Sequence, residues 1–326
     1  MELPCSYYTI EKEIKIMDVL VGYTGFVGSN IAKKHCFDLL VNSKNVEMAY
    51  DSEPDLLVYA GVTGTKWLAN KYPDEDLKII NDAFKNIKKI SPKKLILIST
   101  VDIYDKLEFV DEDYMPDKTK LHTYGYNRYC LEQKVLNSYN NVRIVRLPAL
   151  FGDNIRKNFI YDVIHLIPPI LTVDVYEQLR KECEYISNKY SYDDVYRLFR
   201  ICSLDRESNW KLREWFKKNE FNALNFTNIK SSYQFYDLRN LWDDIQKIQK
   251  LNGTIFNFVT EPLFVEEILN KLGYLTTSTS IDTKRINYNI FTKYSDLSGS
   301  YICTKDEVMK DLCEFIEQEI ANMFPY

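Results

Sequence analysis

Short apolar runs alternate with amphipathic stretches along the first half of the chain. The runs are rich in aliphatic residues and are bounded by turn residues, which is typical of buried parallel strands. Runs of this kind occupy residues 17–21, 39–41, 56–60, 95–98 and 142–147. Because parallel strands need a crossover long enough to hold a helix, the alternation predicts an α/β fold with a doubly wound parallel sheet.

Two stretches carry the clearest helical patterns. In the first, Pro73 suits the first helical position, and the acidic residues 74–76 complement the positive end of the helix dipole. Apolar residues then recur at helical spacing as far as Ile90. A second helix is predicted over 121–139, between the fourth and fifth apolar runs.

The rhythm changes after Gly152. Residues 170–231 are charged, rich in aromatic side chains and predicted to be helical. We therefore expect a Rossmann-type domain over 17–165, to which residues 232–250 return. A smaller mixed α/β region over 166–326 would contain the helical insert.

Glycine is scarce in this chain, with 10 residues among 326, or about 3% against an average of roughly 7%. Three of them, Gly22, Gly25 and Gly28, follow the first apolar run and precede a helix-like stretch. The first permits a tight turn, the second lets the backbone approach a pyrophosphate, and the third lets helix and strand pack closely. The helix N-terminus adds oriented N–H donors. The cluster therefore predicts a dinucleotide site, and a glycine turn without a ligand is the alternative.

The loop after the second predicted strand bears on the choice between NAD and NADP. A carboxylate there would hold both ribose hydroxyls of NAD and repel a 2′-phosphate. This chain has Asn42, Ser43 and Lys44 instead. Because Ser43 and Lys44 would accept a 2′-phosphate, NADP is at least as well suited as NAD. A solvated Lys44 without a role is the alternative.

A tyrosine and a cation share one face of the second predicted helix. Tyr124 and Arg128 are four residues apart, so the cation can hold a phenolate. A positive charge of this kind lowers the pKa of a phenol from about 10, and the phenol can then exchange a proton with a sugar or alcohol hydroxyl. Thr100 lies at the end of the strand over 95–98, where open α/β sheets bind their ligands.

These motifs, in this order, resemble the extended short-chain dehydrogenase/reductases, the group of NAD(P)-dependent sugar-nucleotide epimerases, dehydratases and reductases. The similar segments cover most of the chain and include the cofactor loop, the Ser/Thr strand and the Tyr-x-x-x-Lys helix. They are residues 22–30, 58–62, 80–81, 98–100, 124–128, 146–152, 158–160, 235–238, 243–245 and 253–258. The resemblance implies hydride transfer at a sugar carbon and a nucleotide-sugar-like substrate held by the C-terminal half.

The resemblance also implies roles for individual residues. Tyr124 would be the acid/base, Thr100 would hydrogen-bond the substrate oxygen, and Arg128 would contact the nicotinamide ribose. The substrate residues would be Thr63, Asp102 and Asn158. With the loop after the second strand included, the cofactor residues would be Gly22, Thr24, Gly25, Phe26, Val27, Gly28, Asn42, Ser43, Lys44, Ala60, Gly61, Val62, Asn81, Ser99, Tyr124, Arg128, Pro148, Ala149 and Leu150. A homodimer packed through the helices near 73–90 and 121–139 is implied as well.

The chain departs from the family's pattern in two places. Arg128 stands where the family has lysine, and its guanidinium is bulkier and planar. A working variant, a slow enzyme and a protein that binds cofactor without turnover therefore all remain open. Thr100 is followed by Val101 and Asp102 where the family's dehydratases have Asp-Glu. This difference disfavours a 4,6-dehydratase and leaves a 4-keto reductase or a 4-epimerase.

Composition disfavours several other classes. Charges of both signs are spread along a chain of net charge −5, so it lacks the basic face that nucleic acid requires. The seven cysteines never form a C-x-x-C pair and the three histidines have no i, i+4 partner, so we expect neither a disulfide framework nor a metal site. The first residues lack the apolar core of a signal peptide, and no run reaches 18 apolar residues. We therefore expect a cytoplasmic protein that does not span a membrane.

Overall fold

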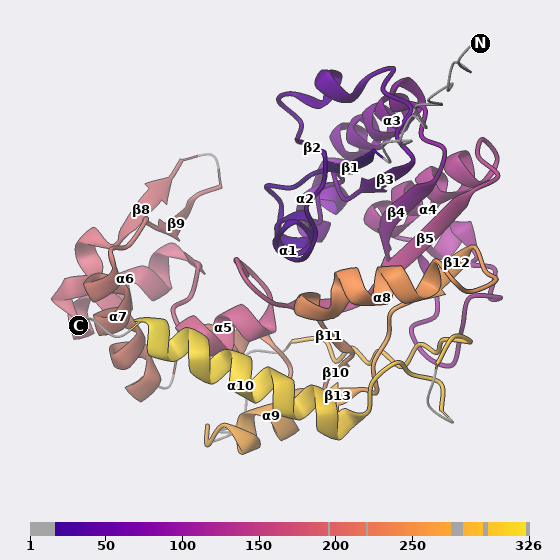
Figure 1. Ribbon diagram of the computed structural model, residues 1–326. Coiled ribbons are helices and arrows are strands. Elements are labelled where there is room, and N and C mark those ends of the chain that lie inside the picture. The colour runs from indigo at the N-terminus through magenta and orange to yellow at the C-terminus, as the bar shows by residue number, and fades with distance from the viewer. Residues whose placement is uncertain (1–16, 195, 220, 275–282, 296–298, 324–326) are drawn as a thin grey trace, which may run out of the picture.

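The core of the protein is a six-stranded parallel sheet, which confirms the predicted Rossmann-type fold (Figure 1). The computed structural model describes residues 17–194, 196–219, 221–274, 283–295 and 299–323. The strands lie in the order β12-β5-β4-β3-β1-β2 across the sheet. They are β1 (Asp18–Val21), β2 (Leu39–Val41), β3 (Leu56–Tyr59), β4 (Leu95–Thr100), β5 (Val142–Leu147) and β12 (Ile255–Asn257).

The strand order reverses at β1. β2 pairs with one edge of this strand and β3 with the other, so that Val21 lies between Val41 and Tyr59. In open α/β sheets, ligands bind outside the carboxyl ends of the strands at such a reversal. Gly22 and Ala60, which directly follow β1 and β3, therefore border the expected ligand crevice.

Helices cover both faces of the sheet. Successive strand residues point to opposite faces, so Val19 and Leu20 belong to different apolar clusters. Burying one such aliphatic side chain stabilises the fold by roughly 1.5–3 kcal/mol. The helices on the Val19 face are α3 (Pro73–Ile90) and α4 (Thr123–Leu136), and those on the Leu20 face are α1 (Phe26–Lys34) and α8 (Leu241–Ile248).

The C-terminal half adds to the sheet and builds a second apolar cluster beside it. α8 packs on the Leu20 face of the sheet, and β12 pairs with β5 at its edge. β6 (Ala149–Phe151) pairs in parallel with β11 (Phe235–Asp237) and links the halves. Within the C-terminal half, β10 (Ser232–Tyr233) pairs in antiparallel with β13 (Leu263–Phe264). Packed around them are α5 (Phe159–His165), α9 (Val265–Lys271) and α10 (Lys305–Met323).

The insert is a compact unit that projects at the left of Figure 1. The sequence predicted helices, and the structure adds a three-stranded antiparallel sheet in the order β7-β9-β8. These strands are only two to four residues long, too short for their pattern to distinguish a strand from a helix. The insert consists of β7 (Ile170–Leu171), α6 (Val173–Glu182), β8 (Tyr190–Asp193), β9 (Leu198–Ile201) and α7 (Arg206–Lys218).

Short helical segments complete the connections. They are α2 (Lys66–Lys71) and the 3-10 turns η1 (Val46–Ala49), η2 (Val101–Ile103), η3 (Lys118–Lys120), η4 (Glu184–Asn188), η5 (Ala223–Phe226) and η6 (Leu238–Asn240). Within the described ranges, no helix is both long and apolar enough to cross a membrane.

Candidate active site

The turn after β1 requires glycine at two of its three glycine positions. Gly22 has a φ of +93°, and a Cβ at this residue would lie 2.5 Å from the Ala60 main-chain oxygen. A Cβ at Gly28 would lie 2.1 Å from the Gly22 oxygen. A larger residue at Gly22 would push the turn away from the residues after β3, and one at Gly28 would push α1 away from the turn. Gly25 is less confined, since its Cβ would meet nothing closer than 3.3 Å.

The N-terminus of α1 opens beside this turn. No side chain caps the helix, and its first turn holds no acidic residue. Thr24 and Gly25 are exposed, while Phe26 and Val27 are partly exposed. Unpaired N–H groups at a helix N-terminus attract anions. This end of α1 can therefore accept a phosphate group.

The loop after β2 lies next to the glycine turn, because the Gly22 N–H donates to the Val41 oxygen at 2.7 Å. Asn42 shapes the loop, since its Oδ1 accepts from the Lys44 N–H at 2.9 Å. The side chains of Ser43 and Lys44 are exposed. A hydroxyl and a cation are thus available beside the turn.

Tyr124 lies in the first turn of α4 and is held there by its surroundings. His122 Nδ1 accepts from the Gly125 N–H at 3.1 Å and caps the helix, which therefore begins two residues later than predicted. The Tyr124 N–H donates to Asn70 Oδ1 at 3.0 Å. The Thr100 side chain lies beside the Tyr124 hydroxyl and favours its ionised form. Two of the three predicted catalytic residues thus meet, one from β4 and one from α4.

Burial raises the pKa of Tyr124, and the nearby Arg128 cation offsets this rise only in part. Arg128 does lower the pKa of Tyr124, as predicted, but burial outweighs it and the net shift is upward, against the predicted lowered pKa. The physical reason is that the phenol is 9% exposed and a phenolate there would lose its hydration. Asp102 and Asp76 add negative charge that favours the neutral form. Tyr124 is consequently a protonated phenol at neutral pH.

Arg128 is buried and bound to other parts of the protein. Its guanidinium carbon lies 3.8 Å from the centre of the Tyr124 ring. Its Nη1 donates to Asp76 Oδ2 at 2.5 Å, and its Nη2 donates to the Thr63 main-chain oxygen at 2.6 Å. The sequence indicated Asp76 only as one of three acidic residues at a helix start. Nothing in the local pattern distinguishes it as the partner of Arg128.

Asp102 is the centre of a second polar cluster close to Tyr124. Its Oδ1 accepts from Lys66 Nζ at 2.8 Å and from the Tyr288 hydroxyl at 2.7 Å. Its N–H donates to Thr100 Oγ1 at 3.1 Å. Asp102 therefore orients Thr100 through the backbone and Lys66 through its carboxylate. Lys66 and Tyr288 were not predicted, because they come from the start of α2 and from the C-terminal half.

Ser99, a predicted cofactor residue, belongs to a buried polar network behind Thr100. Its hydroxyl donates to Glu132 Oε1 at 2.5 Å. Glu132 is fully buried and pairs with Arg146, whose Nη1 donates to the Tyr104 hydroxyl at 2.7 Å. Burial raises the pKa of Tyr104 to about 12, so this phenol is neutral. The network ties β4, α4 and β5 together beneath the site.

Two other predicted residues use their side chains within the protein. Asn158 caps α5, because its Oδ1 accepts from the Ile160 N–H at 3.0 Å, while its Nδ2 donates to the Leu150 oxygen at 2.7 Å. Asn81 accepts from Lys134 Nζ at 2.6 Å, between α3 and α4. Neither amide contacts Tyr124 or Thr100 through an observed hydrogen bond in the described ranges. Ala60, Gly61 and Val62 follow β3, and Pro148, Ala149 and Leu150 follow β5.

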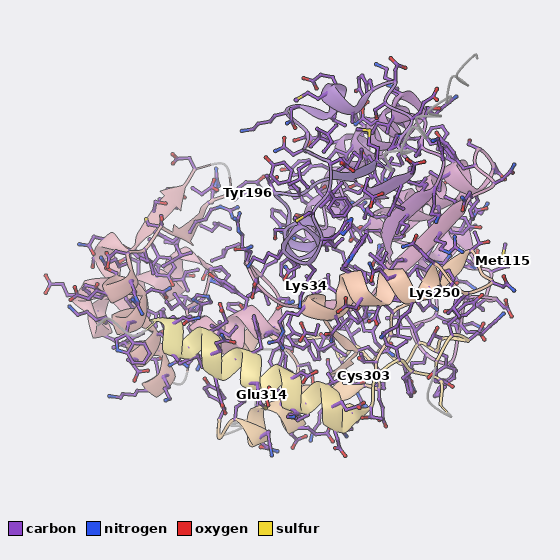
Figure 2. The ribbon with its side chains drawn as sticks, in the orientation of Figure 1. Lys34, Met115, Tyr196, Lys250, Cys303 and Glu314 are labelled. Carbon is purple, nitrogen blue, oxygen red and sulfur yellow. The ribbon has the colours of Figure 1, made fainter. Side chains whose placement is uncertain are left out.

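Two contacts hold the segment between β3 and α3, one from the residues before α5 and one from the insert. Lys157 Nζ donates to the Gly64 oxygen at 2.9 Å, and a Cβ at Gly64 would lie 3.9 Å from the Tyr124 hydroxyl. At the tip of the β8–β9 hairpin, the Tyr196 and Tyr72 hydroxyls are 2.9 Å apart. Figure 2 shows Tyr196 between the hairpin and the N-terminal domain. The segment between β3 and α3 is therefore held at Gly64 and at Tyr72. In the described part of the chain, no group of His, Cys, Asp and Glu residues is arranged to hold a metal ion.

No protein-family model matches the sequence, and no curated protein matches it. Solved structures do match over nearly the whole chain. The dTDP-4-dehydrorhamnose reductase of Yersinia enterocolitica has a TM-score of 0.60 and 14% identity, covering 94% of this chain and 100% of its own. The UDP-glucose 4-epimerase of Thermotoga maritima has a TM-score of 0.56 and 11% identity, and the match covers 94% of this chain and 100% of the epimerase. RMD from Pseudomonas aeruginosa, complexed with NADPH, has a TM-score of 0.58 and 12% identity, covering 93% and 99%.

This chain has their fold. The coverage shows that the likeness extends beyond the parallel sheet to the C-terminal half. At these identities the likeness concerns the fold, and the chemistry of this chain rests on its own residues.

Proposed function

We propose that this chain is an NAD(P)-dependent sugar-nucleotide oxidoreductase or epimerase, acting as a 4-keto reductase or a 4-epimerase with Tyr124 as the acid/base. The observation that carries the proposal is that the Thr100 side chain of β4 lies beside the Tyr124 hydroxyl of α4, at the same edge of the sheet as the Gly22 turn. The fold shared with a nucleotide-sugar reductase and a nucleotide-sugar epimerase supports this kind of reaction.

The residues around α1 fit a dinucleotide. The backbone of the turn packs too closely for a side chain at Gly22 or Gly28, and the uncapped α1 N-terminus beside it would bind the pyrophosphate. Ser43 and Lys44 would accept the 2′-phosphate of NADP, so NADP suits the site at least as well as NAD. When bound, the cofactor supplies or accepts the hydride.

Tyr124 and Thr100 divide the work on the substrate oxygen. Thr100 would orient this oxygen by a hydrogen bond, and Tyr124 would give it a proton as a keto group is reduced. A phenol that keeps its proton is ready to act as the acid, so its raised pKa favours reduction of a keto sugar as the first step. The phenolate left behind would face the Arg128 guanidinium at 3.8 Å.

The first experiment measures cofactor binding and turnover separately. Titration of the purified protein, followed by nicotinamide fluorescence, should show binding of NADPH or NADH. A reductase should consume reduced cofactor with a 4-keto sugar nucleotide, whereas an epimerase should convert a sugar nucleotide without net consumption. Tyr124→Phe should reduce turnover by about 10²–10⁴-fold and leave cofactor binding intact. Unchanged turnover in this variant would remove Tyr124 from the mechanism.

A second candidate function is a protein that binds the cofactor without turnover. The observation that favours it is that Arg128 is 4% exposed and already donates from Nη1 to Asp76 and from Nη2 to the Thr63 oxygen. Such a protein would bind NADPH in the titration and turn over no 4-keto sugar nucleotide. A gain of activity in Arg128→Lys would identify a disabled centre.

A homodimer through α3 and α4 is part of the proposal. Leu77 of α3 and Tyr126 of α4 are 39% and 41% exposed, which leaves apolar surface on both helices. Sedimentation should show a dimer, and Leu77→Glu should yield a monomer. A monomeric native protein would refute this part alone.

The proposal also includes a cytoplasmic location for the protein. The six cysteines of the described ranges are all free thiols, which suits a reducing compartment. Cell fractionation of a tagged full chain should recover it with the cytosol.

A further inference from the structure

Asp76 is a buried carboxylate in the first turn of α3. It is 4% exposed, whereas Asp74 and Glu75 in the same turn are exposed. Its Oδ2 accepts from Arg128 Nη1 at 2.5 Å and from Asn127 Nδ2 at 2.8 Å. All three acids complement the helix dipole, but an exposed carboxylate does so equally well. The burial of Asp76 therefore needs another reason, and its contacts with α4 provide one.

Arg128 links three elements at the candidate reaction centre. One face of its guanidinium lies against the Tyr124 ring of α4, its Nη1 reaches Asp76 of α3, and its Nη2 holds the Thr63 oxygen in the turn after β3. The next residue in that turn, Gly64, borders the Tyr124 hydroxyl. Since the guanidinium is planar and rigid, a contact on one edge fixes the direction of the others.

We propose that Asp76 is a positioning residue that fixes the Arg128 guanidinium between the Tyr124 ring and the Thr63 oxygen and balances its charge beside the reacting phenol. The role deepens the proposed function, on which it rests in taking Tyr124 as the acid/base. The Asp76–Arg128 pair thereby holds Thr63 and Gly64 in place beside the Tyr124 hydroxyl. It also lets Tyr124 keep its proton next to a cation.

The charge of Asp76 can be removed with little change in shape. In Asp76→Asn, the amide oxygen can still accept from Arg128, but the guanidinium is no longer compensated. A cation 3.8 Å from the ring then favours the phenolate more strongly. The pKa of Tyr124 should fall by at least about one unit, a tenfold change in the phenolate-to-phenol ratio at a given pH.

The measurement is a pH titration of protein labelled with ¹³C at the tyrosine Cζ, with the Tyr124 signal assigned by its loss in Tyr124→Phe. Asp74→Asn is the matched control, since it removes an exposed aspartate from the same helical turn. The pKa of Tyr124 should fall in Asp76→Asn and stay unchanged in Asp74→Asn. Equal values in the two variants would overturn the proposal, because a dipole effect or a purely structural role predicts no such difference.

A second comparison covers the case in which Asp76→Asn does not fold. Arg128→Gln leaves the Asp76 charge uncompensated, whereas Asp76→Asn combined with Arg128→Gln removes both charges. The pKa of Tyr124 should be higher in Arg128→Gln than in the double variant, and equal values would overturn the proposal.

The titration needs no turnover, so the two proposals fail separately. An inactive protein whose Tyr124 responds to Asp76 would refute the enzymatic function and keep the positioning role. An active protein that loses turnover in Tyr124→Phe, but whose Tyr124 does not respond to Asp76, would refute the positioning role alone.

Discussion

The main-chain oxygen of Asp102 lies 2.1 Å from the point where a Cβ on residue 125 would stand. This close approach brings the start of α4 against the turn after β4 and so places Tyr124 beside Thr100. A side chain at position 125 would separate the two elements, because neither main chain can move without its neighbours.

Gly125→Ala should therefore destabilise the protein by about 1–3 kcal/mol and reduce turnover, since overpacking displaces the helix that carries Tyr124. Urea unfolding gives the loss of stability. Gly299→Ala is the matched control, because a Cβ at Gly299 would meet nothing within 4 Å. An equal effect of the two substitutions would show that the contact at Gly125 does not matter.

The buried Glu132–Arg146 pair should be costly to break. Glu132→Gln leaves the Arg146 charge at 2% exposure without its counter-ion, so the free energy of unfolding should drop by about 3–5 kcal/mol. Glu177→Gln, which breaks the partly exposed pair with Arg180, should cost less than about 1 kcal/mol. Urea denaturation of both variants tests the contrast. Similar losses would mean that burial of the first pair carries no special penalty.

Lys44 should influence the choice of cofactor. If its exposed ammonium contacts the 2′-phosphate of NADP, Lys44→Ala should weaken NADPH binding by about 1.5- to 5-fold, as for other exposed ion pairs. NADH binding should be unchanged. Lys34, the last residue of α1, lies at the far end of the helix from the glycine turn, so Lys34→Ala serves as the control for general charge effects (Figure 2). Parallel changes for both cofactors would argue against a 2′-phosphate contact.

Asp162 should make stability depend on pH. Burial raises the pKa of its carboxyl from 3.8 to about 7, so between these values the folded protein holds a proton that the unfolded chain has lost. The contribution of this group to stability is therefore present at pH 4 and lost as the pH rises through 7. Asp162→Asn has no carboxyl to titrate, so its stability does not fall in this way. The free energy of unfolding of the variant, minus that of wild type, should increase by about 1–3 kcal/mol from pH 4 to pH 8, allowing for screening by water.

The measurement is urea unfolding at both pH values. Asp174→Asn, an exposed aspartate of α6, should show no such pH-dependent gain. A constant difference between Asp162→Asn and wild type would exclude the titration of this carboxyl as the cause.

Local pattern was sufficient for the elements that carry the candidate site. The five N-terminal strands follow from apolar runs, and the turn of Gly22, Gly25 and Gly28 follows from its place between a strand and a helix. Tyr124 and Thr100 could be paired from sequence because each lies at a recognisable end of an element. The strands of the insert escaped prediction, since segments such as Tyr190–Asp193 are held by their partners rather than by their own pattern.

What the sequence by itself determined is the doubly wound sheet, the position of the glycine turn and the residues at the ends of β4 and α4. These follow from periodicity and turn chemistry, which act between near neighbours in the chain. Only the tertiary structure decided how the charges are used. Asp76 and Arg128 are 52 residues apart and belong to different helices, and their pairing depends on how α3 and α4 pack. The same packing buries Tyr124, so the pKa of its phenol rises where spacing alone predicted a fall. A cation four residues away predicts attraction, but the cost of burial and the counter-ion are properties of the folded protein.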